Sequence, residues 1–328
     1  MDVSLVKERL GNDWVSVLSS IADALQSDIT LLNDTNNRIL LHSGKQLRPL
    51  LALLMARACK PGEPLGESTI RYAAASELLH NATLLHDDVA DESDCRRGVP
   101  TINSLMGPSV SVLVGDYWLV KAMDLILGNA GTDIRAIRIF SKTLSDLAKG
   151  EMLQLQKSMK SDTTESDYLS IIYCKTASLF EAACLSAVIS VNASEEYEKA
   201  AVRYATSIGL AFQIKDDLLD YVGGDSVGKP LGADLDEQKI TAPLLGAFEN
   251  VGKDEQDRIR NMIGNIHSRP EYKQEIVDFV INNGGISKAS AKLDLYVEEA
   301  VKALDVFPSS FEKDCLVELA HFVAVRKN

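Results

Sequence analysis

The sequence predicts an all-α protein, a single large helical bundle, and three observations support this prediction. Apolar residues recur at spacings of three and four along nearly the whole chain, as they do between Leu5 and Leu25. Strict alternation of apolar and polar residues, which is typical of a half-buried strand, is rare. The 328 residues are 46% apolar, 25% charged and 6% aromatic, which is enough apolar material to bury a sizeable core and too much for a disordered chain.

The predicted helices follow one another with short breaks between them. They cover residues 3–26, 29–41, 46–59, 66–91, 108–128, 131–159, 164–190, 194–222, 238–249, 252–265, 271–283, 286–304 and 309–325. The breaks contain the glycine and proline residues that end helices. Because no break is long enough for an interdomain linker, we expect residues 1–328 to form a single domain.

Charge and cysteine content exclude several classes of protein. The net charge of −13, from 34 Lys and Arg against 47 Asp and Glu, argues against binding to nucleic acid or to an anionic membrane, because both require a basic face. The five cysteines include no Cys-x-x-Cys pair, which is typical of a reducing compartment. No signal-peptide pattern and no run of about 18 uncharged apolar residues is present. We therefore expect a cytoplasmic protein without stable membrane insertion.

One short acidic pattern, Asp-Asp-x-x-Asp, occurs twice, each time at the end of an apolar helical run. The first copy is Asp87, Asp88 and Asp91, and the second is Asp216, Asp217 and Asp220. Residues four apart lie on one face of a helix, so each copy projects two carboxylates to one place. Such carboxylates require counter-charge, and Mg²⁺ supplies it, since this ion is usually bound by one or two carboxylates together with substrate phosphates.

The alternatives for these aspartates are weaker. A single Asp near a helix end is most often a cap or a solvated residue, but two copies of one pattern, each followed by a basic loop that contains glycine, are not explained in this way. A calcium loop of the EF-hand type has alternating ligands and ends in Glu, which neither copy does. The pattern therefore favours two magnesium-binding helix ends.

Basic residues follow or precede both acidic clusters, where phosphates would bind. They are Lys45, Arg48, Arg96, Arg97, Lys175, Lys229 and Lys239, with Thr176 beside Lys175. Each alone would more often be a solvated surface charge. Their positions on either side of the Asp clusters favour a role in phosphate binding instead. Lys45 and Arg48 begin a predicted helix, whose amides favour anions. Two Asp clusters that bind Mg²⁺, with separate Lys and Arg groups around them, predict a site for two diphosphates.

In this order the motifs resemble the trans-isoprenyl diphosphate synthases, also called polyprenyl synthetases. The segments that carry the resemblance are GKQLRP, ELLHNATLLHDDVADESDCRRG, VLVGDY, GEMLQLQ, YCKTASLF, GLAFQIKDDLLDY, GKPLGADLDEQKITAP and NNGGIS, which together extend over nearly the whole chain. The resemblance implies an all-α bundle around a deep central cavity, the isoprenoid synthase fold. It also implies a homodimer, with the two Asp motifs facing each other across the cavity mouth.

The resemblance further implies a role for each residue. The principal ligands of a cluster of three Mg²⁺ on the allylic diphosphate would be Asp87, Asp91 and Asp216, with Asp88, Asp217 and Asp220 as direct or indirect helpers. That diphosphate would be held by Arg96, Lys175 and Lys229, with Lys239 nearby. Isopentenyl diphosphate would be held by Gly44, Lys45, Arg48, His80 and Arg97. Thr176 and Gln213 would face the developing carbocation.

These roles describe one reaction. Ionisation of the allylic diphosphate leaves a carbocation and a diphosphate whose charge metal ions and fixed cations stabilise. The double bond of isopentenyl diphosphate attacks the cation, and in the family the released proton goes to the departing diphosphate. Without the motif, His80 would be a packed or surface histidine. Gln238 stands where the family often has glycine. Arg326 and Lys327 stand where some relatives contribute basic residues to the isopentenyl site, but we expect them to be a frayed tail.

The helix that leads to Asp87 predicts a long product. Ala82 and Thr83 occupy the positions where short-chain relatives usually carry a bulky aromatic residue, so the path for the growing chain is open. Each helical turn rises about 5.4 Å, close to the reach of one isoprene unit, which favours a product of roughly six to ten units, about C30 to C50. Trp118 and Met123 are candidates for the floor, although ordinary core packing explains both.

Three other functions remain open from the sequence. A short-chain farnesyl or geranylgeranyl diphosphate synthase would share all the motifs and differ in product length. A noncatalytic synthase subunit would usually lack Asp or Arg residues of the clusters, and this chain keeps them. A terpene cyclase would lack the Gly-Lys-x-x-Arg-Pro segment, which begins here at Gly44.

Overall fold

The computed structural model describes residues 3–96, 98–128, 133–222 and 232–326. Over these residues every regular element is helical except one hairpin of two short strands, β1 (Cys95–Arg96) and β2 (Val99–Pro100). The predicted all-α class is therefore confirmed. Contacts divide the chain into two compact units. Unit 1 comprises Met1–Ser141, Ala182–Val202 and Val306–Leu316, and unit 2 comprises Lys142–Glu181, Arg203–Asp305 and Val317–Asn328.

Each unit contains complete helices of its own. Those of unit 1 are α1 (Val3–Leu10), α2 (Asn12–Ala24), α3 (Thr30–Leu41), α4 (Leu47–Cys59), α5 (Glu67–Ala90), α6 (Ile102–Met106) and α7 (Pro108–Leu127). Those of unit 2 are α9 (Glu165–Ile172), the π-helical turn η1 (Tyr173–Ala177), α12 (Ala233–Asp236), α13 (Ala242–Phe248), α14 (Lys253–Gly264), α15 (Tyr272–Asn282) and α16 (Gly285–Ala303). Residues of both units occur in α8 (Ile134–Lys160), α10 (Ser178–Ser190), α11 (Glu195–Val222), η2 (Leu304–Val306) and α17 (Phe311–Val325).

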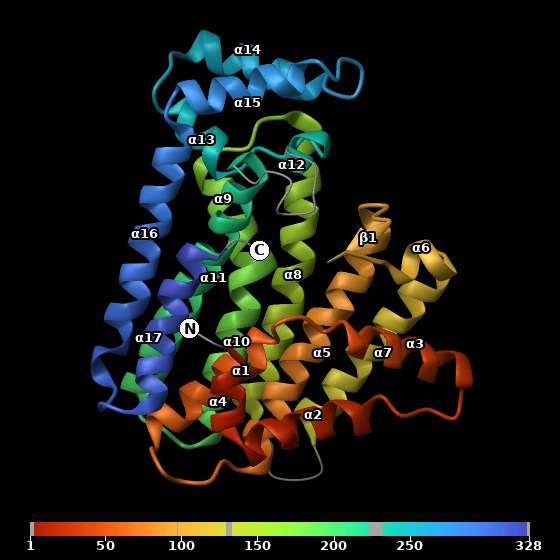
Figure 1. The fold of residues 1–328 in the computed structure, drawn as a ribbon, viewed down its shortest axis with the longest axis vertical. Helices are drawn as coiled ribbons and strands as arrows, with labels where there is room; N and C mark the ends of the chain where they lie inside the picture. Colours follow the sequence, from red (N-terminus) through yellow and green to blue (C-terminus); the bar gives the residue numbers. More distant parts are fainter. Residues whose placement is uncertain (1–2, 97, 129–132, 223–231, 327–328) are drawn as a thin grey trace. The chain divides into compact units, whose positions relative to one another are not determined.

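The core of unit 1 forms around α5. Its middle turns are buried, and small side chains such as Ala73, Ala74 and Ala75 let the neighbouring helices approach. α5 packs along α7 and also contacts α2 and α4, and Figure 1 shows α5 beside α7. The last turn of α5, which carries the first Asp cluster, is therefore the end of a helix that is held on several sides.

In unit 2, α13 packs closely against α16. A Cβ atom on Gly285 would lie 2.1 Å from the carbonyl oxygen of Pro243, so only glycine permits this approach. α14 packs beside α15, as Figure 1 also shows. The start of α13 follows an extended Thr241, and this junction contributes a backbone amide to the second Asp cluster.

The predicted helices agree with the structure except at a few places. The predicted helix 3–26 is two helices, because Gly11 takes a φ of 57° between α1 and α2. The predicted helix 238–249 begins only at Ala242, since Thr241 is extended. The prediction also missed α6, α12, the β1–β2 hairpin and the π-helical turn inside the predicted helix 164–190.

One helical stretch, Glu165–Ser190, is long and apolar enough to cross a membrane by length and composition. It contains Lys175 and Glu181, so it is not an uncharged run. In the structure 72% of its most apolar 18-residue segment is buried. Buried core helices share this length and apolar composition, so the stretch is weak evidence for a membrane span.

Candidate active site

The first Asp cluster lies at the carboxyl end of α5. Asp87 and Asp88 belong to its last turn, and Asp91 is its C-cap residue. Asp88 is buried, and its Oδ1 accepts a hydrogen bond from Arg96 Nε at 2.7 Å. Asp87 is half-buried and Asp91 is exposed. Arg96 therefore neutralises the buried carboxylate, while the two carboxylates expected to bind metal lie nearer to solvent.

The loop after the first cluster is bonded back onto α5, which positions Arg96. The carbonyl oxygen of Asp88 accepts hydrogen bonds from the amide of Ser93 at 3.0 Å and from Asn103 Nδ2 at 3.1 Å. The β1–β2 hairpin carries Arg96 in its first strand. Arg97, the next predicted phosphate ligand, lies outside the described residues.

The residues predicted to hold isopentenyl diphosphate begin at the amino end of α4. Gly44 and Gln46 both adopt left-handed conformations, with φ of 69° and 52°, and turn the chain into the helix. Lys45 between them is exposed, while Arg48 in the first turn is buried. The amides and dipole of α4 favour an anion at this end. His80 is half-buried on α5.

The second Asp cluster lies in α11, within unit 2, and Asp217 is its buried member. Asp217 accepts hydrogen bonds from Tyr168 Oη at 2.5 Å, from Gln213 Nε2 at 3.1 Å and from the amide of Ala242 at 3.3 Å. Burial raises the pKa of Asp217 to about 6, against the opposing effect of these donors. Asp217 thus joins α9 and the start of α13 to α11.

Asp216, the next carboxylate of the cluster, pairs with Arg326. Arg326 Nη2 donates to Asp216 Oδ1 at 2.7 Å and to the carbonyl oxygen of Phe212 at 2.9 Å. The guanidinium carbon of Arg326 also lies 3.8 Å from the centroid of the Phe212 ring. Arg326 is 8% exposed, so the expectation of a frayed tail is wrong for this residue. Lys327 lies outside the described residues.

Asp220 caps the short helix α12. Its carboxylate accepts hydrogen bonds from the amides of Ala233 and Asp234 at 2.9 and 3.1 Å. Burial, followed by the charges of nearby carboxylates, raises the pKa of Asp234 well above its usual range. Lys239 forms an ion pair with Glu237 just after α12. Asp220 therefore positions the segment that carries Asp234 and Lys239.

Lys175 and Thr176 lie in the π-helical turn η1 and reach two different helices. Lys175 Nζ bonds to Glu151 at 2.7 Å and to Gln154 Oε1 at 3.1 Å, both on α8. Thr176 Oγ1 donates to Gln213 Oε1 on α11 at 2.9 Å. Since Gln213 in turn donates to Asp217, a row of hydrogen bonds runs from the π-helical turn to the second Asp cluster.

A cavity of about 110 Å³ in unit 2 gathers several of these groups. Its lining is Gln154, Ser158, Thr163, Tyr168, Ile171, Ile172, Lys175, Gln213, Asp217, Asp234, Lys239, Ile240 and Thr241. The structure therefore brings predicted residues from three separate motifs to one cavity. Lys229, predicted to join them, lies outside the described residues.

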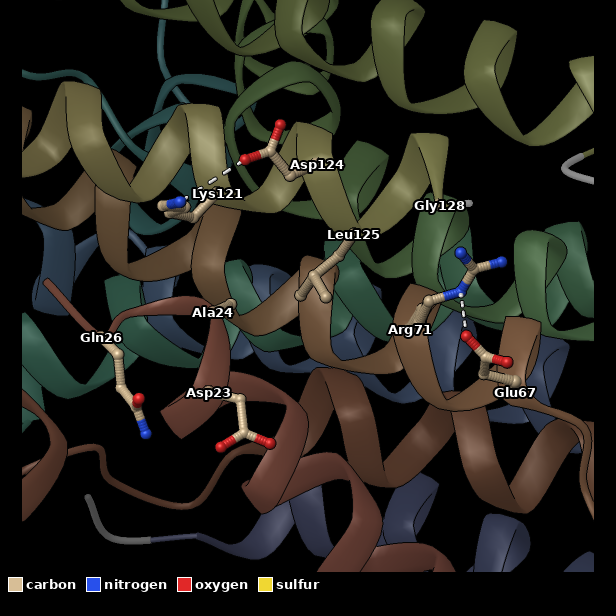
Figure 2. Close-up of a pocket in the computed structure, with 9 residues that line it drawn as sticks. All are labelled: Asp23, Ala24, Gln26, Glu67, Arg71, Lys121, Asp124, Leu125 and Gly128. Atoms are coloured by element: carbon tan, nitrogen blue, oxygen red, sulfur yellow. Dashed lines mark ion pairs between the residues drawn. The ribbon is translucent and has the colours of Figure 1, made fainter. Parts of the chain in front are cut away.

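A second cavity, in unit 1, holds none of the predicted site residues. Its volume is about 260 Å³, and it lies among α2, α5 and α7 (Figure 2). Charges of both signs line it, and they pair with each other, Lys121 with Asp124 at 3.6 Å and Arg71 with Glu67 at 3.7 Å. Its charges are therefore largely compensated within the protein.

The residues predicted to set chain length lie on α5 and α7. Ala82 is fully buried, and Thr83 is half-buried with its hydroxyl donating to the carbonyl oxygen of His80 at 2.8 Å. Trp118 is fully buried and its Nε1 donates to Asn36 Oδ1 at 2.8 Å. Met123 is half-buried. The hydrogen bond of Trp118 fixes its ring in the core of unit 1.

Within the described part of the chain, no three or more His, Cys, Asp or Glu side chains already converge as a metal site. The chemistry of the two clusters still fits a hard divalent cation, because each offers carboxylate oxygens at a helix end. Asp216 also accepts a hydrogen bond from the Arg326 guanidinium at 2.7 Å, so a metal ion bound there would share this carboxylate with Arg326.

Comparison with known proteins identifies the family. A family model described as "Polyprenyl synthetase" matches residues 29–280. The chain belongs to the polyprenyl synthetase family. It is 35% identical to the octaprenyl diphosphate synthase of Escherichia coli K12, over 99% of each chain. It is 36% identical to the all-trans-nonaprenyl-diphosphate synthase (geranyl-diphosphate specific) of Rhodobacter capsulatus, over 97% of this chain and 96% of that protein.

A solved structure of the family has the same fold. The polyprenyl synthase of Caulobacter crescentus CB15, in complex with calcium and isoprenyl diphosphate, matches with a TM-score of 0.90 and 32% identity, over 100% of this chain and 98% of that one. The predicted isoprenoid synthase fold is thereby confirmed. As a polyprenyl synthetase, the protein is a prenyltransferase of isoprenoid biosynthesis.

Sequence reasoning missed three residues that the structure places at the second cluster. Tyr168 donates to Asp217, Asp234 lines the cavity, and Arg326 pairs with Asp216. Asp234 could have been found from the motif GADLDEQK, in which it precedes Lys239 by five residues. Tyr168 and Arg326 leave no local signal, because their roles depend on contacts between segments far apart in sequence.

Proposed function

We propose that this polyprenyl synthetase condenses isopentenyl diphosphate head to tail with an allylic diphosphate and makes a long all-trans polyprenyl diphosphate. The row of hydrogen bonds from Thr176 through Gln213 to Asp217 carries the proposal. It places a hydroxyl and an amide oxygen next to a carboxylate cluster, and Lys175 lines one cavity together with Gln213 and Asp217. Fixed dipoles and charges of this kind stabilise a cationic intermediate formed beside a bound diphosphate.

The metal ligands we propose are Asp87, Asp91 and Asp216, with three Mg²⁺ ions at the site. When bound, the ions neutralise the charge that develops on the departing diphosphate. Two observations support this assignment. None of the three carboxylates is fully buried: Asp87 and Asp216 are half-buried and Asp91 is exposed. The calcium complex of the Caulobacter relative contains a divalent cation together with isoprenyl diphosphate.

Asp88, Asp217 and Asp220 act in our proposal by holding the site together. Each is already engaged by donors of the protein: Asp88 by Arg96, Asp217 by Tyr168 and Gln213, and Asp220 by the amides that begin α12. These bonds fix the helix ends from which the principal ligands project.

The basic residues divide between the two substrates. Arg96, Lys175, Lys229 and Lys239 bind the allylic diphosphate, and Gly44, Lys45, Arg48, His80 and Arg97 bind isopentenyl diphosphate. The ion pair with Glu151 holds Lys175 at the cavity wall before substrate arrives. The oxygens of Thr176 and Gln213 stabilise the carbocation, and the departing diphosphate takes the proton that the adduct loses.

Product length follows from α5 in this proposal. The buried Ala82 and the half-buried Thr83 offer little bulk at the start of the path for the growing chain, and Trp118 and Met123 form its floor. The names of the two relatives, octaprenyl and nonaprenyl synthases, support a long product. A short-chain synthase is the alternative.

We further propose that residues 1–328 work as one domain and that the protein is a homodimer in the cytoplasm. The family model spans residues of both units, and the Caulobacter structure matches the whole chain, which supports a single domain. Sedimentation of the purified protein tests the dimer: a monomeric mass at micromolar concentration would contradict it.

Incubation of the purified protein with Mg²⁺, farnesyl diphosphate and labelled isopentenyl diphosphate tests the function. We expect label in a linear all-trans product that is longer than geranylgeranyl diphosphate. Label confined to a geranylgeranyl product would favour the short-chain alternative. A cyclised hydrocarbon made without isopentenyl diphosphate would indicate a cyclase, and no product would indicate a noncatalytic subunit.

A further inference from the structure

The π-helical turn η1 carries two adjacent residues that contact different helices. Neighbouring residues of a regular helix project roughly 100° apart, and here Lys175 contacts α8 while Thr176 contacts α11. A π-helical turn is rare and costs hydrogen-bond geometry, so it persists only where the surrounding structure holds it. The contacts around η1 therefore determine where Lys175 and Thr176 point.

Two glycines let the flanking helices approach this turn. A Cβ atom on Gly150 of α8 would lie 2.8 Å from both Cys174 Cβ and Lys175 Cγ. A Cβ atom on Gly209 of α11 would lie 2.4 Å from Ala177 Cα. Both distances are shorter than side-chain packing allows, so each flanking helix lacks a side chain where it meets η1.

A hydrogen-bonded brace spans the same turn. Tyr173, its first residue, accepts a hydrogen bond from Lys142 Nζ at 3.1 Å and donates to Glu181 Oε2 at 3.0 Å. Glu181 lies in α10, beyond the end of the turn, and its Oε2 also accepts from Thr206 Oγ1 at 3.1 Å. The brace thus joins both ends of η1 to α8, through Lys142, and to α11, through Thr206.

The hydroxyl of Tyr173 is suited to this role. Burial raises the pKa of Tyr173, so the hydroxyl stays protonated at neutral pH and can donate to Glu181. None of Tyr173, Glu181, Gly150 or Gly209 is among the groups assigned above to substrate or metal. Their contacts are with the turn and with each other's helices.

We propose that Tyr173, Glu181, Gly150 and Gly209 are positioning residues for prenyl transfer, because they fix the π-helical turn that aims Lys175 at the diphosphate and Thr176 at the carbocation. The inference rests on the proposed function, which assigns those two roles. Displacement of a reacting group by about 1 Å can cost roughly 100-fold in rate. Loss of the brace should therefore lower kcat strongly while the thermal midpoint of unfolding changes little.

Tyr173→Phe tests the brace with the smallest change. We expect kcat with farnesyl diphosphate to fall about 10- to 100-fold, with the KM for isopentenyl diphosphate and the thermal midpoint nearly unchanged. Tyr117→Phe is the control, since it also removes a hydroxyl, one that makes a single hydrogen bond, to the Gln26 carbonyl oxygen at 3.0 Å, at an exposed site of α7. Its kcat should match that of the wild type.

Substitutions of Glu181 separate positioning from general destabilisation. Glu181→Gln keeps an oxygen that accepts from Tyr173 and should retain most of the activity. Glu181→Leu removes the acceptor and should lower kcat as Tyr173→Phe does. If only the bulk of this side chain mattered, Glu181→Leu would retain as much activity as Glu181→Gln.

The glycines are tested by Gly209→Ala against Gly264→Ala. The added Cβ on Gly264 would meet Ser161 Oγ at 3.4 Å, an ordinary contact, so this control should be fully active. Gly209→Ala should lose kcat, and if it does not fold, the Tyr173 and Glu181 variants still decide the matter.

The positioning role and the prenyl-transfer function fail under different results. An active wild-type enzyme whose kcat is unaffected by Tyr173→Phe and by Glu181→Leu would overturn the positioning role and leave the proposed function standing. A wild-type protein that transfers no prenyl group would refute the proposed function itself.

Discussion

Arg326 is a single side chain near the end of the chain that makes three contacts with α11. It pairs with Asp216, donates to the carbonyl oxygen of Phe212 and lies against the Phe212 ring. Only 6% of its side chain is exposed. The Asp216 side chain is 44% exposed, so water can solvate its carboxylate when Arg326 is replaced. A substitution therefore loses chiefly the hydrogen bonds and the ring contact of the buried guanidinium.

Arg326→Gln should therefore lower the free energy of unfolding by about 1 to 2 kcal/mol. Urea denaturation of the metal-free protein measures this loss. Arg135→Gln is the control, because Arg135 makes two ion pairs, with Asp133 and Glu198, from a half-exposed position. Exposed pairs contribute about 0 to 1 kcal/mol, so equal losses in the two variants would contradict the structural role of Arg326.

At the scale of an element, α9 begins with a capping box that depends on pH. Thr164 Oγ1 accepts from the amide of Asp167, and the Asp167 carboxylate accepts from the amide of Thr164. Burial alone would raise the pKa of Asp167, but hydrogen bonds from Lys157 and Thr164 outweigh it and lower the pKa to about 2. The folded state therefore favours the ionised carboxylate.

The sign of the effect follows from this shift. A carboxyl group with a lowered pKa stabilises the fold above its unfolded value of about 4 and loses that contribution as the pH falls towards 2. Asp167→Asn should cost about 1 kcal/mol at pH 7 and progressively less below pH 4. Denaturation at several pH values measures this, and a cost that stays constant down to pH 2.5 would contradict it.

The sequence predicted the helices well and the irregular elements poorly, for a physical reason. Long helices such as α5 and α11 carry a periodic apolar pattern that can be recognised locally. The β1–β2 hairpin has two residues in each strand and no periodicity to detect. The π-helical turn depends on Gly150 and Gly209, which lie in other helices, so its local sequence predicts an ordinary helix.

The same distinction applies to the candidate site. Asp87 and Asp216 could be recognised because each belongs to a local motif. The partners of those motifs could not, since Tyr168 and Arg326 reach the second cluster from 49 and 110 residues away. Local chemistry is readable from the sequence, and the contacts that hold it in place are not.

At the scale of the whole molecule, product length tests whether α5 lines the path of the growing chain. Ala82→Phe adds a large ring at a fully buried position and should shorten the main product by several isoprene units. Leu84→Phe, two residues further along α5, projects from another face of the helix and should leave product length unchanged. Chromatography of the dephosphorylated products measures both.

An unchanged product from a folded Ala82→Phe enzyme would contradict this path. Overpacking at a buried site costs about 1 to 3 kcal/mol, so the thermal midpoint of each variant is measured beside the product. A shorter product from both variants would indicate a general loss of processivity instead.

The proposed function assigns Asp87 and Asp216 to one magnesium-bound diphosphate. A double-mutant cycle on kcat/KM for farnesyl diphosphate, with Asp87→Asn, Asp216→Asn and the combined variant, tests it most directly. Groups that act as a unit have strongly non-additive effects. We predict that each single variant loses at least about 100-fold in rate and that the combined variant is little worse than the poorer single one. Losses that multiply, or single variants that retain full activity with Mg²⁺, would contradict the claim.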